Sequence, residues 1–129
     1  MSKKRILIVD DDVPLTHAMR INLEDTGDYE VHVENSSLRA IPAAREFKPD
    51  IILLDIVMPD LDGGDISALL KADPELSRIP VLMVTALVSN TESSDAPVTK
   101  GDRIMLAKPI QFDKLVAAVE SILAGSASS

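Results

Sequence analysis

Residues 51–59 read Ile51-Ile52-Leu53-Leu54-Asp55-Ile56-Val57-Met58-Pro59, an apolar run that ends at a carboxylate. Such a run, bounded by turn residues, is typical of a strand buried on both faces of a parallel sheet. A second run, Ile6-Leu7-Ile8-Val9, ends at Asp10-Asp11-Asp12. Because parallel strands deliver their last side chains to the same edge of a sheet, the two stretches predict one acidic pocket at that edge.

Strand-like and helix-like segments alternate along the chain, which indicates βαβ units and a parallel sheet. We expect strands at residues 5–9, 30–33, 51–54, 80–85 and 104–107, and helices at about 14–25, 38–47, 65–71 and 112–123. Asn35-Ser36-Ser37 can cap the second helix. Pro42 lies inside that helix, removes one backbone hydrogen bond and predicts a kink or a late start.

One segment breaks the alternation. Residues 88–102 lie where a fourth helix is due, but they are rich in Ser, Thr and Asp and have no apolar stripe. These side chains compete with the helical backbone for hydrogen bonds. We therefore expect a loop, or at most one or two turns of helix. Residues 1–124 are expected to form one domain, followed by a flexible tail at 125–129.

Composition narrows the possible functions. The 129 residues suffice for one domain with its own core, and the absence of Cys excludes thiol catalysis and disulfides. A net charge of −8 disfavours direct binding to nucleic acid. No apolar run is long enough for a membrane span or a signal peptide, so we expect a cytoplasmic protein without membrane insertion.

Polar groups lie at or just past four of the predicted strands: Asp10 and Asp11, Asp55, Thr85 and Lys108. Clustered carboxylates repel one another unless a cation compensates, and Mg²⁺ favours oxygen ligands. Asp11 and Asp55 are candidate ligands, with Asp10 binding directly or through water. Lys108 adds a positive charge and Thr85 a hydroxyl donor. The set suits a tetrahedral anion that is attached to, or attacked by, a carboxylate.

The chain resembles the receiver domain of two-component response regulators. Five stretches carry the resemblance, in the family's order and spacing: 6–12, Leu53-Leu54-Asp55, Met58-Pro59-Asp60-Leu61-Asp62-Gly63, Val81-Leu82-Met83-Val84-Thr85-Ala86 and Ala107-Lys108-Pro109. The resemblance implies a flavodoxin-like (βα)₅ three-layer sandwich with strand order 2-1-3-4-5. The chain is expected to depart from the family at residues 88–102, where the fourth helix is degraded or replaced by a loop. It also implies a cis Lys108–Pro109 peptide bond.

The resemblance further implies that Asp55 accepts a phosphoryl group from a histidine kinase or a histidine phosphotransfer protein. Asp10, Asp11, Asp55 and the backbone carbonyl of Val57 would hold Mg²⁺, while Thr85 and Lys108 would contact the phosphoryl oxygens. The protein would not be an enzyme beyond its own phosphorylation and slow autodephosphorylation. With no effector domain attached, it would act on an unknown downstream protein or as a relay.

Three positions bear on switching and lifetime. Met105 stands where such receivers often carry an aromatic side chain that turns inward on phosphorylation, so the output is expected to differ. Val57 and Leu87 lie two residues after Asp55 and Thr85. The resemblance implies that both would flank the path of an attacking water. Both are apolar and can neither orient that water nor help it enter, which predicts slow loss of the phosphoryl group.

Two other functions remain open. A phosphorylation-independent adaptor would keep the fold and bind partners, but it would have no need of the complete polar set. A small phosphatase-like hydrolase would need a second acid or base near Asp55 and a substrate pocket, and the sequence offers neither clearly.

Overall fold

The computed structural model describes residues 3–56, 58–85, 98–100 and 103–127. Its sheet has the order β2-β1-β3-β4-β6-β5, and all neighbouring pairs are parallel except β5 with β6. The strands are β1 (Lys4–Val9), β2 (Tyr29–Glu34), β3 (Ile51–Leu54), β4 (Val81–Thr85), β5 (Val98–Lys100) and β6 (Arg103–Ala107). The five parallel strands are β1, β2, β3, β4 and β6, and β6 is the fifth strand of the predicted set. Their arrangement therefore confirms the order 2-1-3-4-5 predicted from the sequence.

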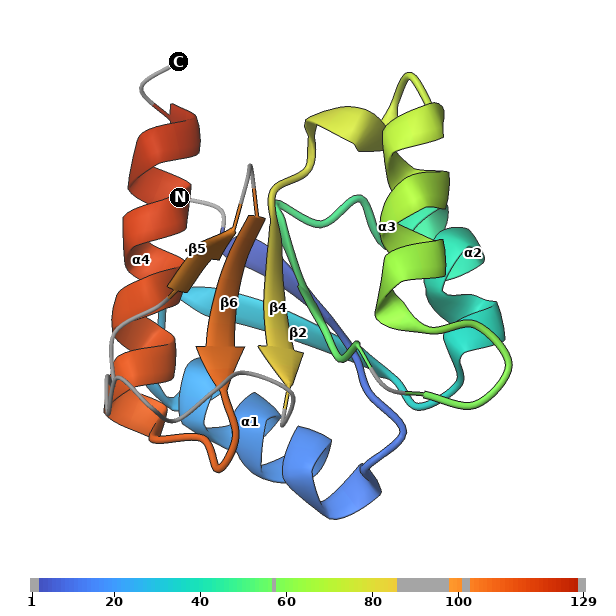
Figure 1. Cartoon of the computed structure of the whole chain (residues 1–129). Helices are drawn as coiled ribbons and strands as arrows, with labels where there is room; N and C mark the ends of the chain where they lie inside the picture. The colour runs from blue at the N-terminus through green and yellow to red at the C-terminus, as the bar shows by residue number, and fades with distance from the viewer. Residues whose placement is uncertain (1–2, 57, 86–97, 101–102, 128–129) are drawn as a thin grey trace.

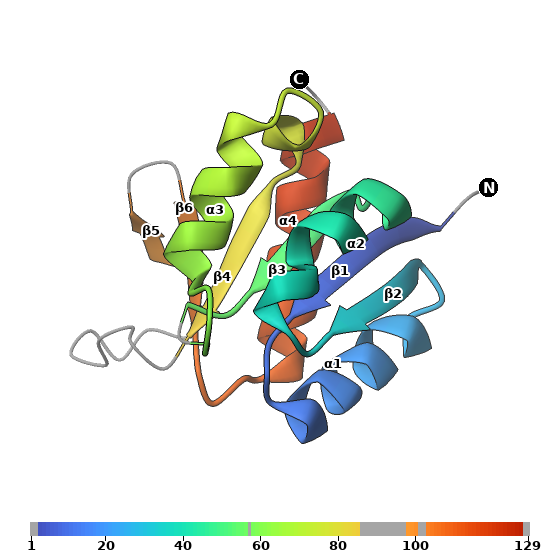
Figure 2. The ribbon, with the colours of Figure 1, turned by 90° about the vertical axis from the view of Figure 1, so that its right-hand side faces the viewer.

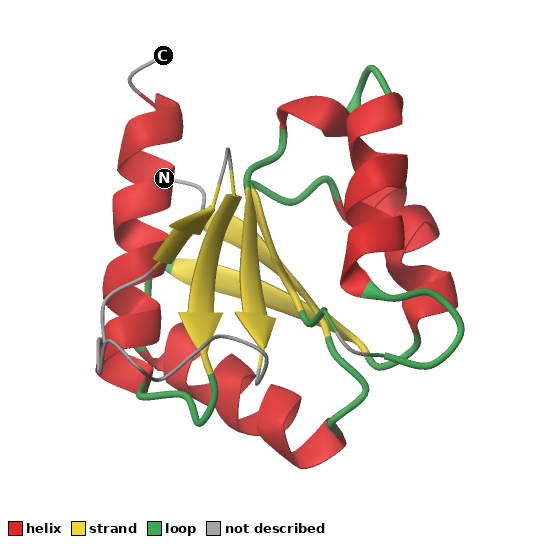
Figure 3. Ribbon diagram, viewed as in Figure 1, coloured by secondary structure: helices red, strands yellow, loops and turns green. Residues whose placement is uncertain are grey.

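Helices cover both faces of the sheet (Figures 1 and 3). One face packs against α1 (Val13–Asp25) and α4 (Phe112–Ala127), and the other against α2 (Ala40–Phe47) and α3 (Gly63–Ala72). Alternate strand residues supply the two cores. In β1, Ile6 and Ile8 face α1 and α4, while Leu7 and Val9 face α2 and α3. In Figure 2 the molecule is seen from the side of α2 and α3, with the sheet behind them and α4 behind the sheet.

The second helix begins late, as Pro42 predicted. Residues Ser37–Arg39 form a 3₁₀ turn, and α2 starts at Ala40. Pro42 then lies in the first turn of the helix. Backbone N–H groups in that turn have no intrahelical acceptor, so the absence of an N–H at Pro42 costs no helical hydrogen bond. The predicted cap at residues 35–37 is wrong, because Ser36 precedes the turn without a side-chain capping bond. Asn35 and Ser37 use their side chains elsewhere.

The prediction of a loop or short helix at 88–102 is wrong for residues 98–100, which form β5, antiparallel to β6. Two of these residues, Val98 and Thr99, are β-branched and favour extended backbone. Residues 88–97 and 101–102 lie outside the described residues. The predicted tail also needs correction, since α4 continues to Ala127.

The remaining helix ends follow local capping. Asp12 accepts a hydrogen bond from Leu15 N at 3.1 Å and caps α1. Asp62 and Asp65 form a reciprocal capping box, so α3 begins at Gly63 rather than at the predicted residue 65. A short 3₁₀ turn, η2 (Leu76–Arg78), follows α3. None of the helices in the described part of the chain is long and apolar enough to cross a bilayer.

Candidate functional site

The acidic pocket forms where β1 and β3 end side by side. Val9 and Leu54 are partners in the sheet, and Asp55 N donates to Val9 O at 3.0 Å. The next residues, Asp10 and Asp55, are therefore neighbours, and they are only 2% and 5% exposed. Asp11 is exposed, and carboxylate oxygens of all three aspartates lie within 4.8 Å of one another. The predicted convergence of these side chains is thus present in the structure.

Lys108 follows β6 and reaches across β4 to the same carboxylates. Its Nζ lies 3.0 Å from Asp10 Oδ2 and 3.4 Å from Asp55 Oδ2, and the side chain is 20% exposed. The Lys108–Pro109 peptide bond is cis, as the resemblance implied.

The protonation equilibria of the pocket reflect its burial. Burial raises the pKa of Asp10 above its ordinary value, although a hydrogen bond from Asp12 N and the contact with Lys108 oppose the shift. Burial by itself would lower the pKa of Lys108. The hydrogen bond and charge of Asp10, together with Asp55, outweigh that effect and raise the Lys108 pKa. The raised pKa of Lys108 favours its ammonium form beside the two carboxyl groups.

The donor set fits a hard divalent cation. Three carboxylates and one ammonium leave a net negative charge in a largely buried site, and carboxylate oxygens are the ligands that Mg²⁺ and Ca²⁺ prefer. Asp11 is exposed and can present an oxygen from the solvent side. The acidic cluster can hold such a metal ion.

The other predicted site residues are placed only in part. Thr85 is the last residue of β4 and pairs with Ala107, so its backbone lies at the same edge as Asp55. Val57 and Leu87 lie outside the described residues. Met105 is half-buried on the α2–α3 side of the sheet, with Met83 and Val98 as its strand partners. Their expected roles in chemistry, lifetime and switching remain predictions.

Gly63 supports the pocket in a way that the sequence reading missed. Its N–H donates to Ile56 O at 2.8 Å, which closes the loop between β3 and α3. A Cβ at this position would lie 2.6 Å from Asp55 O and 2.7 Å from Ile56 Cα. Only glycine lets α3 start this close to the backbone of Asp55. The turn-rich run around it was a visible signal for a loop, but not for this contact.

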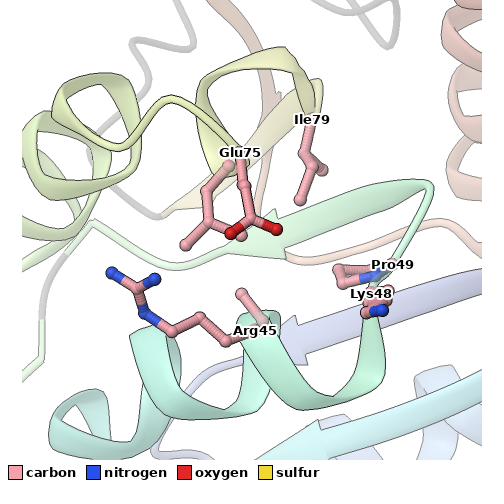
Figure 4. Close-up of a pocket in the computed structure, with 7 residues that line it drawn as sticks. Arg45, Lys48, Pro49, Glu75 and Ile79 are labelled. Carbon is pink, nitrogen blue, oxygen red and sulfur yellow. The ribbon is translucent and has the colours of Figure 1, made fainter.

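A separate cavity of about 350 Å³ opens at the opposite, amino edge of the sheet (Figure 4). It is lined by Ala44, Arg45, Lys48, Pro49, Glu75, Leu76 and Ile79. Arg45 of α2 pairs with Asp73 beyond α3, and Asp73 also accepts from Glu75 N at 2.8 Å. Partial burial raises the pKa of Asp73, but the hydrogen bonds from Glu75 and Leu76 and the Arg45 guanidinium outweigh it and lower that pKa. The cavity is distinct from the acidic pocket.

A sheet whose five parallel strands have the order 2-1-3-4-5, with an acidic cluster at its carboxyl edge, is the arrangement of a signalling receiver domain. Residues 6–120 match the model of the response regulator receiver domain family, and the chain belongs to that family. It is similar to protein PilH of Pseudomonas aeruginosa, with 36% identity over 94% of this chain and 98% of PilH. It is also similar to the DNA-binding dual master transcriptional regulator RpaA of Synechocystis, with 34% identity over 92% of this chain. The chain spans only 48% of RpaA.

Solved structures of receiver domains have the same fold as this chain. A CheY-like receiver domain protein from Methanospirillum hungatei superposes with a TM-score of 0.79, 25% identity and coverage of 98% of both chains. The receiver domain of a histidine kinase from Syntrophus aciditrophicus gives a TM-score of 0.78 and 28% identity, over 95% of this chain and 91% of that one. The family and fold predicted from the sequence are confirmed.

Proposed function

We propose that this chain is a phosphoacceptor of a two-component phosphorelay and that Asp55 is the residue phosphorylated. The observation that carries the proposal is the Asp55 carboxylate itself, which is buried, lies 3.4 Å from Lys108 Nζ and shares a cluster with Asp10 and Asp11. A buried carboxylate beside both a cation and further carboxylates is suited to nucleophilic attack on a phosphoryl group.

In the proposed reaction, an Asp55 oxygen forms the new O–P bond while the P–N bond to a donor phosphohistidine breaks and the electron pair returns to the imidazole. The donor belongs to a histidine kinase or a histidine phosphotransfer protein. Lys108 offsets charge on the transferred oxygens, and Thr85, at the end of β4, would donate its hydroxyl to them. Asp10, Asp11, Asp55 and the carbonyl of Val57 would hold Mg²⁺, which supplies further positive charge when bound.

The output follows from the same proposal. The relatives named for DNA binding are about twice the length of this chain, so their DNA binding is not assigned to it. We expect the phosphorylated protein to act on a partner protein, in the cytoplasm, and to lose its phosphoryl group slowly. No substrate other than the phosphodonor is proposed.

The test is phosphorylation of the purified protein by a small phosphodonor with Mg²⁺, read by intact mass and by NMR with beryllofluoride as phosphoryl mimic. The wild type should gain one phosphoryl group, and Asp55→Asn should gain none. Asp50→Asn is the matched control, because Asp50 directly precedes the first residue of β3, whereas Asp55 directly follows the last. This variant should be phosphorylated normally. If the wild type forms no adduct at Asp55, the adaptor function is favoured instead.

A further inference from the structure

Asn35, which follows the edge strand β2, contacts the loop that carries Asp10 and Asp11. Its side-chain Nδ2 donates to Asp10 O at 2.8 Å and to Thr16 Oγ1 at 3.0 Å. Thr16 lies in the first turn of α1, is 1% exposed and donates its own hydroxyl hydrogen to Val13 O. One amide group therefore uses both of its hydrogens to fix the β1–α1 loop to the end of β2.

Ser37, two residues further on, contacts the loop that follows Asp55. Its hydroxyl donates to Pro59 O at 2.8 Å and accepts from Leu61 N at 3.1 Å, and the residue is 4% exposed. The two contacts lie on either side of Asp60, whose φ of 70° is in the left-handed region. Because a residue other than glycine is uncommon in that conformation, the hydroxyl stabilises an otherwise unfavourable turn.

The segment after β2 therefore contacts both loops that bear the carboxylates. Asn35 binds the β1–α1 loop, which carries Asp10, and Ser37 binds the β3–α3 loop, which carries Asp55. Asp10 and Asp55 lie in a largely buried site together with Asp11, so their charges repel one another and favour separation of the loops. Lys108 opposes this repulsion by charge, whereas Asn35 and Ser37 oppose it by neutral hydrogen bonds to backbone atoms. Such bonds carry no charge that would compete with a metal ion for the carboxylates.

We propose that Asn35 and Ser37 are positioning residues of the acidic site, which hold the β1–α1 and β3–α3 loops at the spacing that metal binding and phosphoryl transfer require. The inference rests on the proposed function, because those two activities are what the spacing is expected to set. Neither residue touches the reacting atoms. Hydrogen-bonded supports of metal ligands commonly change metal affinity by about 10- to 100-fold when removed.

The experiment compares Asn35→Ala and Ser37→Ala with the wild type in Mg²⁺ titrations followed by NMR, at a temperature where every variant is folded. Each variant should bind Mg²⁺ about tenfold more weakly. Half-saturation of the phosphorylation rate should move to higher Mg²⁺ by a similar factor, with a smaller loss in the rate at saturating Mg²⁺. Amide hydrogen exchange should accelerate at Leu61 in Ser37→Ala. Ser37→Thr keeps the hydroxyl and should restore much of the affinity.

Two controls separate positioning from general stability. Thr26→Ala removes a hydroxyl that also donates to a carbonyl, Leu23 O at 2.8 Å, and accepts from a backbone N–H, Asp28 N at 3.2 Å, but at the far end of α1. Ser67→Ala removes the hydroxyl of a residue as buried as Ser37, 2% against 4% exposed. Both should leave Mg²⁺ affinity within about twofold of the wild type, well below the effect of removing a ligand support.

The outcomes are distinguishable. If the wild type binds Mg²⁺ and is phosphorylated while Asn35→Ala and Ser37→Ala match it in both, the positioning role is wrong and the proposed function stands. If the wild type neither binds Mg²⁺ nor accepts a phosphoryl group, both are overturned. If Ser37→Ala fails to fold, Asn35→Ala decides the question by itself, because it removes the bonds to Asp10 O and Thr16 Oγ1.

Discussion

Replacing Lys108 with Met should affect stability, metal binding and phosphoryl transfer in different directions. The substitution keeps most of the aliphatic stem and removes an ammonium that lies 3.0 Å from Asp10 Oδ2 and 3.4 Å from Asp55 Oδ2. Two buried carboxylates then lose the cation that compensates them. In the absence of metal the variant should be less stable than the wild type. Its two carboxylates, however, no longer contact the ammonium and are available to bind a metal ion.

The magnitude follows from the burial of the partners. Removing one partner of a fully buried ion pair costs about 3–5 kcal/mol. Since the Lys108 side chain is 20% exposed, solvent screens part of the interaction, and we expect a loss of about 2–3 kcal/mol at neutral pH. For a chain of 129 residues this lowers the Tm by roughly 8 °C. Mg²⁺ should bind about tenfold more tightly, an increment of about 1.4 kcal/mol.

The assay is thermal unfolding over a series of Mg²⁺ concentrations, combined with the rate of phosphorylation by a small phosphodonor. At a given free Mg²⁺ concentration, tighter binding stabilises the folded protein more, so Mg²⁺ should raise the Tm of the variant more than that of the wild type. Phosphorylation should nevertheless slow by about 100-fold, because a positive charge near the transferred oxygens has been removed.

Lys114→Met is the matched control, because Lys114 is exposed on α4, and it should change stability by no more than about 0.5 kcal/mol. The reasoning is refuted if Lys108→Met loses no more stability than this control. It is also refuted if Mg²⁺ stabilises the Lys108 variant less than the wild type, since that would mean that the ammonium does not compete for the carboxylates.

Three further changes test other parts of the structure. Gly63→Ala places a Cβ 2.6 Å from Asp55 O and should cost about 2 kcal/mol in urea unfolding, whereas Gly125→Ala meets no atom within 4 Å and should be neutral or stabilising. Asp73→Asn should lower stability above about pH 4. That deficit should shrink as the pH falls through the lowered Asp73 pKa, because the wild type loses the same charge there; a deficit independent of pH would contradict the assignment. Mg²⁺ affinity should fall with decreasing pH, because protons compete with the metal ion for the Asp10 carboxylate. Since the pKa of Asp10 is raised, the fall should begin at a pH above 3.8, the ordinary pKa of an Asp side chain. Calorimetric Mg²⁺ titrations over a pH series measure the change in affinity.

The parallel strands and the acidic edge could be predicted because both leave local patterns. The run at 51–54 is apolar throughout, and the observed strand has those bounds. Asp10, Asp55 and Lys108 each come directly after a predicted strand, and parallel strands leave no freedom about the edge at which their carboxyl ends meet. The convergence of these side chains therefore needed no tertiary information beyond strand direction.

The supports of the site could not be predicted in the same way. Asn35 and Ser37 match the local pattern of a helix cap, but their bonds reach residues 19 to 25 positions away and have no periodicity in the sequence. Strand β5 has three residues, too few to show an alternating pattern, and it is fixed by pairing with β6. Gly63 looks like any turn glycine until the loop places it against Asp55.

The β5–β6 pair also bears on how the outer half of the sheet assembles during folding. Lys100 pairs with Arg103 only three residues away, whereas the pairing of β6 with β4 joins residues such as Leu82 and Ile104, which are far apart in the chain. Hairpins form in about 1–10 μs, before most long-range pairings are found. Strand β6 can thus be held extended by its local partner β5 before it pairs with β4.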